Sequence, residues 1–188
     1  MTTVFSSIAL SWDLVLITFF AVVVSYSYIL GRSQSARIII ATYVAIIATQ
    51  GLSAIALKIL TSSSVSLEIF GPSITPTGLA SAKIILLAIL IIFFVLRSGI
   101  ELSHSDPGIF AGFLLTGAYG FATASLIVST ILTFISGKGI LEGPLMLPAS
   151  LAALSQTSDL TIFFLKNQAL WFTLPAILFI IGSMLRKK

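Results

Sequence analysis

One histidine and two carboxylates lie close together in a polar stretch of the chain. Glu101, His104 and Asp106 span six positions, and histidine with carboxylates can bind a metal ion or transfer protons. Three ligands of mixed type in a loop are more typical of solvated side chains, because a closed metal site needs a fourth ligand. We therefore expect no metal site at this turn.

The apolar segments lack the residue pairs that hydrolysis within a membrane requires. That chemistry uses a serine beside a histidine or lysine, two facing aspartates, or a histidine-rich zinc motif. The chain has a single histidine and no cysteine, which also excludes thiol catalysis and disulfides. Lys166 is the one charged residue that could lie deep in a bilayer. We expect a protein that is not an enzyme, with no catalytic residue and no cofactor.

Hydroxyl and amide side chains are frequent in several apolar segments. Thr18, Ser25, Gln50 and Tyr119 could line a water-filled path, which gives the alternative function of a channel or transporter subunit. Such side chains also join membrane helices by hydrogen bonds worth about 0.6 kcal/mol each. Ion pathways usually include a charged residue inside the bundle, and charges are scarce here, so helix packing is the favoured interpretation.

Small residues recur at a strict spacing of four in the fourth apolar segment. They are Gly108, Gly112, Thr116, Gly120 and Ala124, and this set is called the small-residue ridge below. Residues four apart share one face of a helix, and small residues there allow a second helix to approach closely. The ridge predicts a packing face, either within one chain or between chains of a homo-oligomer or a larger membrane complex.

The composition places these segments in a membrane. Of 188 residues, 57% are apolar and 9% are charged, and the mean hydropathy is +1.15. So few polar residues could not cover a soluble domain. We expect an all-α integral membrane protein, a polytopic helical bundle that forms one transmembrane domain over residues 1–188 and is surrounded by lipids.

Five apolar segments approach the length of about 20 residues that a membrane helix needs. They cover residues 14–30, 38–57, 79–96, 108–135 and 169–185. The short link between the first two predicts an antiparallel hairpin, Pro175 predicts a kink in the last, and residues 159–165 are expected to form an interfacial helix. Arrangements with four or six spans, the latter with a re-entrant pair, remain alternatives.

The charges predict an orientation for the five spans. One side receives six basic and two acidic residues, for a net charge of +4: Arg32, Arg37, Arg97, Arg186, Lys187 and Lys188, with Glu101 and Asp106. The other side is neutral, with Lys58, Lys83, Lys138 and Lys166 against Asp13, Glu68, Glu142 and Asp159. By the positive-inside rule, the N-terminus is outside and the C-terminus is cytoplasmic. The basic residues form no patch with interleaved aromatics, so nucleic acid is not an expected partner.

Several segments resemble the colicin V production proteins, a family of bacterial inner-membrane proteins. They are the opening WDL at 12–14, the turn Gly31-Arg32, the glycine-rich start GIFAGFLLTG at 108–117, and LWFTLP at 170–175. The family typically has four spans and a more basic first turn, which differs from the five spans expected here. The resemblance implies a multi-pass protein of the bacterial inner membrane, linked to toxin export or envelope maintenance, without a catalytic mechanism.

These patterns together favour a non-enzymatic membrane protein of the cell envelope. Its predicted mode of action is helix-mediated assembly, because the small-residue ridge of the fourth span is the most specific pattern in the chain.

Overall fold

A computed structural model describes residues 12–62, 76–97, 109–136 and 159–184, which form helices and no strand. The six helices are α1 (Trp12–Leu30), α2 (Arg32–Ser62), α3 (Pro76–Arg97), α4 (Ile109–Ser136), α6 (Asp159–Lys166) and α7 (Gln168–Met184). The helices α1 to α4 are each long and apolar enough to cross a membrane, and α6 with α7 forms a fifth, bent candidate. The prediction of an all-helical protein with four to five apolar helices compatible with a membrane bundle is confirmed.

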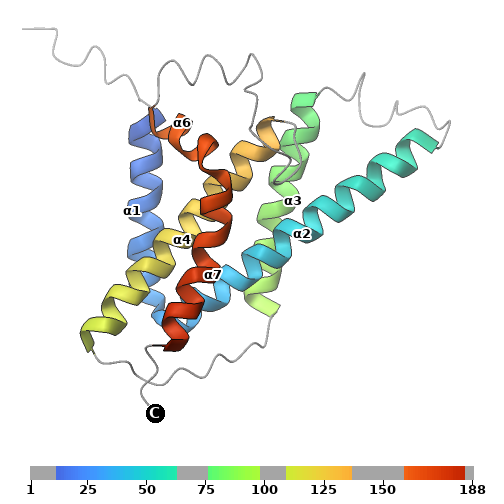
Figure 1. Ribbon diagram of the computed structural model, residues 1–188. Coiled ribbons are helices and arrows are strands. Elements are labelled where there is room, and N and C mark those ends of the chain that lie inside the picture. Colours follow the sequence, from blue (N-terminus) through green and yellow to red (C-terminus); the bar gives the residue numbers. More distant parts are fainter. Residues whose placement is uncertain (1–11, 63–75, 98–108, 137–158, 185–188) are drawn as a thin grey trace, which may run out of the picture.

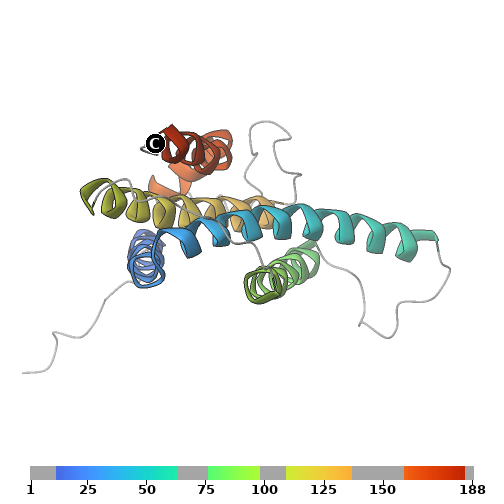
Figure 2. The same ribbon diagram turned by 90° about the horizontal axis from the view of Figure 1, so that it is seen from below.

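The helices form three layers with α4 at the centre. The middle layer contains α2 and α4, with α1 and α3 on one side and α6 and α7 on the other (Figure 2). Each of the other five helices contacts α4. In the membrane-length part of α4, 67% of the residues are buried, against 6% in α1 and in α3. Consequently α4 is the inner helix on which the other helices pack.

The link between α1 and α2 is a single residue. Gly31 has a φ of +79°, and its N–H donates to the carbonyl of Ser27 at 3.0 Å. Glycine reaches this left-handed region without steric cost. The helix α2 therefore begins at Arg32, before the apolar span expected from residue 38. The two helices diverge from this turn and do not lie along each other as the expected hairpin would, and α2 instead packs on α3 and α4 (Figure 1).

The C-terminal pair α6 and α7 is sharply bent. Their axes differ by 76° at Asn167, whose side-chain amide donates to the carbonyl of Phe163 at 2.9 Å. The helix α7 continues through Pro175 without interruption. The break in this segment thus lies at Asn167, at the end of the short helix expected at 159–165.

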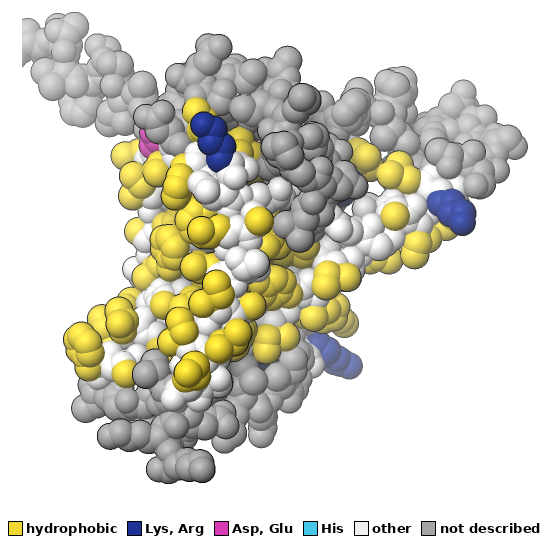
Figure 3. Space-filling model, in the orientation of Figure 1, with side chains coloured by type: hydrophobic (Ala, Val, Ile, Leu, Met, Phe, Trp, Pro, Cys, Tyr) yellow, Lys and Arg dark blue, Asp and Glu magenta, His cyan; other side chains and the backbone are white. Residues whose placement is uncertain are grey.

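Apolar side chains cover much of the visible surface of the bundle. In Figure 3 they spread over the helices, whereas the Lys and Arg side chains in view lie near helix ends. Large apolar side chains such as Ile29, Ile47 and Phe110 are 81%, 70% and 82% exposed. A soluble protein rarely exposes contiguous apolar surface on this scale, and lipid is the solvent that suits it.

Candidate functional site

The C-terminal part of the small-residue ridge packs against α1. A Cβ on Gly120 would lie 2.7 Å from the Cβ of Ser27 and 3.0 Å from the Cα of Val24. Such distances leave no room for a methyl group, so the backbones of α4 and α1 approach as only glycine permits. Thr116 and Ala124 on the same ridge are buried as well. This part of the ridge is occupied by a helix of the same chain.

The N-terminal part of the ridge is open. A Cβ on Gly112 would meet no atom within 4 Å. The neighbouring side chains Phe110, Phe113 and Leu114 are 82%, 62% and 65% exposed. Gly108 lies outside the described residues. The ridge therefore has a filled part at Gly120 and an unoccupied part at Gly112.

A buried polar junction joins three helices beside the filled part of the ridge. Ser27 Oγ of α1 donates to the carbonyl of Thr116 in α4 at 2.9 Å. It also lies 2.6 Å from Ser35 Oγ of α2. Because each buried hydroxyl has a partner, the junction avoids the cost of an unpaired polar group, and it ties the start of α2 to the α1–α4 contact.

A second glycine of α4, Gly117, packs against the side chain of Tyr28 in α1. A Cβ on Gly117 would lie 2.2 Å from the hydroxyl oxygen of Tyr28, so only glycine leaves the tyrosine in place. The ring of Tyr28 stacks on Phe113 with centroids 4.5 Å apart, a favourable aromatic geometry. This ring pair covers α4 between its open and filled parts.

Three polar or small residues of α7 and α4 were not identified as candidates from the sequence. Gln168 Nε2 donates to Thr133 Oγ1 at 2.6 Å, and both residues are buried. Gly182 lies against Tyr119, since a Cβ there would be 2.6 Å from the tyrosine oxygen. A glutamine that opens an otherwise apolar helix was a usable signal, because an amide in lipid needs a partner.

The four residues proposed to line a polar path are not brought together. Thr18 and Ser25 are exposed on α1, Gln50 is half-buried on α2, and Tyr119 is fully buried beside α7. Most of the buried α4 hydroxyls donate to carbonyls of their own helix, as Thr123 and Thr130 do at 2.8 Å and 2.7 Å. These contacts are typical of hydroxyls that pack inside a bundle.

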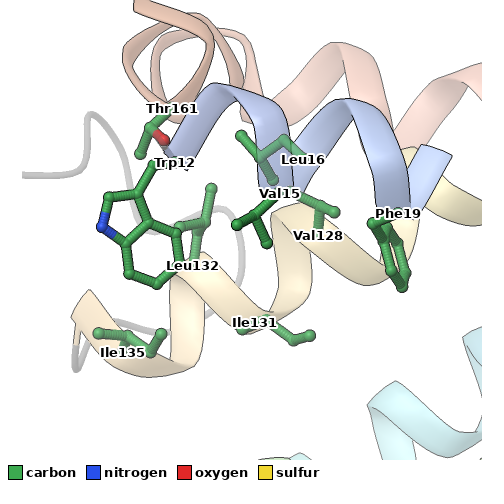
Figure 4. A pocket seen from close by; sticks show the side chains of 9 residues that line it. All are labelled: Trp12, Val15, Leu16, Phe19, Val128, Ile131, Leu132, Ile135 and Thr161. Carbon is green, nitrogen blue, oxygen red and sulfur yellow. The ribbon is translucent and has the colours of Figure 1, made fainter. Parts of the chain in front are cut away.

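One apolar pocket of about 190 Å³ opens between α1 and α4 below α6 (Figure 4). Its lining is Trp12, Val15, Leu16 and Phe19 of α1, Val128, Ile131, Leu132 and Ile135 of α4, and Thr161 of α6. Beside it, Trp171 stacks on Phe164 with centroids 4.5 Å apart. A pocket with this lining offers no group for catalysis.

No protein-family model matches the chain, and neither a curated protein nor a solved structure does. The resemblance to the colicin V production proteins therefore stays a prediction.

The ionisable residues give no reactive cluster within the described ranges. Glu101, His104 and Asp106 lie outside those ranges, and the described part of the chain holds no group of three metal-binding side chains. Lys166 is exposed at the end of α6. The most specific arrangement is thus the small-residue ridge of α4, filled at one end and open at the other.

Proposed function

We propose that the protein acts without catalysis, through assembly with another membrane helix at the open part of the ridge on α4. This contact face is centred on Gly112. The partner helix belongs to a second copy of the chain or to another subunit of a larger membrane complex.

The open environment of Gly112 is the observation that carries the proposal. Gly112 has no neighbour within 4 Å of a Cβ position, while Gly120 on the same ridge lies in close helix contact. Association in lipid depends on close van der Waals packing, because burying apolar surface gains little there. A glycine on a helix surface that is otherwise large and apolar supplies the groove that such packing needs.

We further propose the orientation and location that the charges and the resemblance support. The N-terminus is outside, the C-terminus is cytoplasmic, and the membrane is the bacterial inner membrane, where the protein contributes to export or envelope maintenance. Support comes from the arginines, since Arg32 and Arg97 lie at helix ends on one side of the bundle (Figure 1).

Sizing of two matched variants tests the assembly. Gly112→Leu fills the groove, and Gly51→Leu makes the same change at an open glycine of α2, outside the proposed face. In blue-native electrophoresis of native membranes, we expect wild type and Gly51→Leu to migrate above the monomer and Gly112→Leu to shift toward it. A wild-type band at monomer size, or an unchanged size for Gly112→Leu, contradicts the proposal.

A crosslink identifies the surface when the partner is a second copy. The chain has no cysteine, so single introduced cysteines report one position each. Gly112→Cys places the thiol on the proposed face and is expected to form an intermolecular disulfide in oxidised membranes. Ile47→Cys, which is 70% exposed on α2, is the control and should remain monomeric.

A further inference from the structure

A groove of about 380 Å³ lies between the outer half of α2 and the first half of α3. Leucine and alanine side chains line most of it, including Leu52, Ala56 and Leu57 of α2 and Leu79, Ala82 and Leu86 of α3. Ala56 and Ala82 are exposed, so the groove opens sideways onto the surroundings of the bundle. In a membrane, those surroundings are lipid acyl chains.

The groove contains one charged side chain, Lys83 of α3. Lys83 is half-buried, and its Nζ lies 5.9 Å from the ring centroid of Phe134 in α4. Among the described residues, this ring is the one partner that the ammonium has. An aromatic face attracts a cation but accepts no ordinary hydrogen bond, so no described residue accepts from the three N–H donors of the ammonium, which suit an anion.

The position of Lys83 along α3 suits a lipid headgroup. Lys83 follows the start of α3 at Pro76 by seven residues, which is about 10 Å along a helix axis. A lysine at that depth extends its ammonium toward the interface while its methylene chain stays among apolar groups. This places a positive charge near the phosphate layer, with an apolar groove beside it that leads toward the bilayer centre.

We infer that this groove holds a membrane phospholipid, with one acyl chain between α2 and α3 and the lipid phosphate on the ammonium of Lys83. The charge must provide the selectivity, because an acyl chain gains little by leaving other chains for an apolar groove. A charge-assisted hydrogen bond from N⁺–H to a phosphate oxygen is the strong contact available there. The expected ligand is therefore a lipid with an anionic headgroup.

Three variants separate the contribution of the Lys83 charge to lipid binding from the contribution of the apolar groove. Lys83→Met keeps a long apolar side chain and removes the charge. Lys58→Met makes the same change on an exposed lysine of α2 that does not line the groove. Ala56→Trp fills the groove and keeps both lysines, and the exposure of Ala56 allows this change without disturbing the core. Thermal unfolding of each variant shows that it is folded.

Native mass spectrometry of the purified full chain in detergent, titrated with phosphatidylglycerol, measures the binding. We expect wild type and Lys58→Met to retain one lipid, and Lys83→Met and Ala56→Trp to bind about tenfold more weakly. Diacylglycerol with the same chains should bind poorly to wild type, because it lacks the phosphate. Glycerol 3-phosphate should not displace the lipid, because it lacks the chains.

Several results would overturn the inference. Unchanged binding by Lys83→Met or by Ala56→Trp would exclude this groove. Equal losses in Lys83→Met and Lys58→Met would indicate attraction by net charge alone. Displacement by glycerol 3-phosphate would indicate a simple anion site, and equal binding of diacylglycerol would remove the role of the phosphate. None of these readouts depends on assembly at Gly112, since the groove lies on other helices.

Discussion

Gly112 and Gly120 share one face of α4 but meet different surroundings. A Cβ on Gly120 would lie 3.0 Å or less from atoms of Val24 and Ser27, whereas a Cβ on Gly112 would meet nothing within 4 Å. The same substitution changes helix propensity equally at both positions. The difference between their effects on the free energy of unfolding therefore measures the contact between α4 and α1 at Gly120.

The first prediction concerns Gly120→Ala and Gly112→Ala. We expect Gly120→Ala to lower the free energy of unfolding by about 1–3 kcal/mol, the usual cost of forcing a methyl group into a packed site. Gly112→Ala should stabilise the fold by up to about 1 kcal/mol, because alanine favours helix. Unfolding of both variants in mixed detergent micelles, followed by far-UV circular dichroism, gives the comparison. Equal effects at the two sites would contradict the close contact at Gly120.

The residue types along the ridge show that another helix can approach closely, but not which helix packs there. The four-residue spacing on α4 predicts a face of small residues, whereas the assignment of α1 to Gly120 depends on a contact between distant segments. Thr18 and Ser25 illustrate the same limit. Their hydroxyls are exposed on α1, because sequence alone does not determine how an apolar helix is rotated in its bundle.

The α1–α2 connection shows how one backbone conformation positions two helices. Gly31 holds a φ of +79°, and a Cβ there would meet nothing within 4 Å. Any cost of substitution at Gly31 is therefore a backbone cost.

The second prediction concerns Gly31→Ala and Gly31→Asn. Gly31→Ala should lower the free energy of unfolding by about 1–2 kcal/mol, because a left-handed backbone is strained for an L-residue with a Cβ. Gly31→Asn should cost less, since asparagine tolerates this region. Thermal unfolding of the two variants under identical conditions gives the order. A larger loss in Gly31→Asn than in Gly31→Ala would contradict the backbone explanation.

Helix boundaries were less predictable than the helices themselves. The apolar part of α2 marks a membrane span, but the helix begins earlier, at Arg32, and ends at Ser62. Hydropathy does not mark helix ends, and residues such as Ser33 and Gln34 continue a helix without being apolar. The break at Asn167 is another example, because Pro175 is the stronger helix breaker by type and yet lies within continuous α7.

At the scale of the whole molecule, successive helices run alternately between the two ends of the bundle. The end of α2 and the start of α3 lie at one end, and the start of α2 and the end of α3 lie at the other (Figure 1). A probe that does not cross the membrane distinguishes these ends.

The third prediction uses two exposed positions and the lack of native cysteine. Ile59 of α2 and Leu96 of α3 are 57% and 79% exposed. Replacing either of them by cysteine does not alter the net charge. In intact cells, we expect an impermeant maleimide to label Ile59→Cys, and to label Leu96→Cys only after lysis. The reverse pattern would place the arginines outside and would contradict the proposed orientation.

Composition was sufficient to predict an all-helical membrane protein, but not its layers. Apolar residues face both the lipid and the core, so hydropathy does not identify the inner helix. Hydroxyl content does not identify it either, because α2 and α4 each contain seven Ser and Thr residues, although Thr116, Thr123, Ser129 and Thr133 of α4 are all buried. The contacts between distant segments decide the layers, since α4 is the helix that each of the others contacts.

The bend at Asn167 has a consequence for the thickness of the surrounding bilayer. As a span, α7 has 17 residues, or about 26 Å of helix, whereas a typical hydrocarbon core is about 30 Å thick. Because α6 turns away by 76°, it adds little to that length. Lipids next to α7 can match this length by thinning locally, at a cost of a fraction of a kcal/mol per Å, whereas α2 and α4, with 31 and 28 residues, match a bilayer by tilting. Short-chain lipids beside α7 would relieve this compression, so the bilayer around the protein should be thinner at α7 than at α2 and α4.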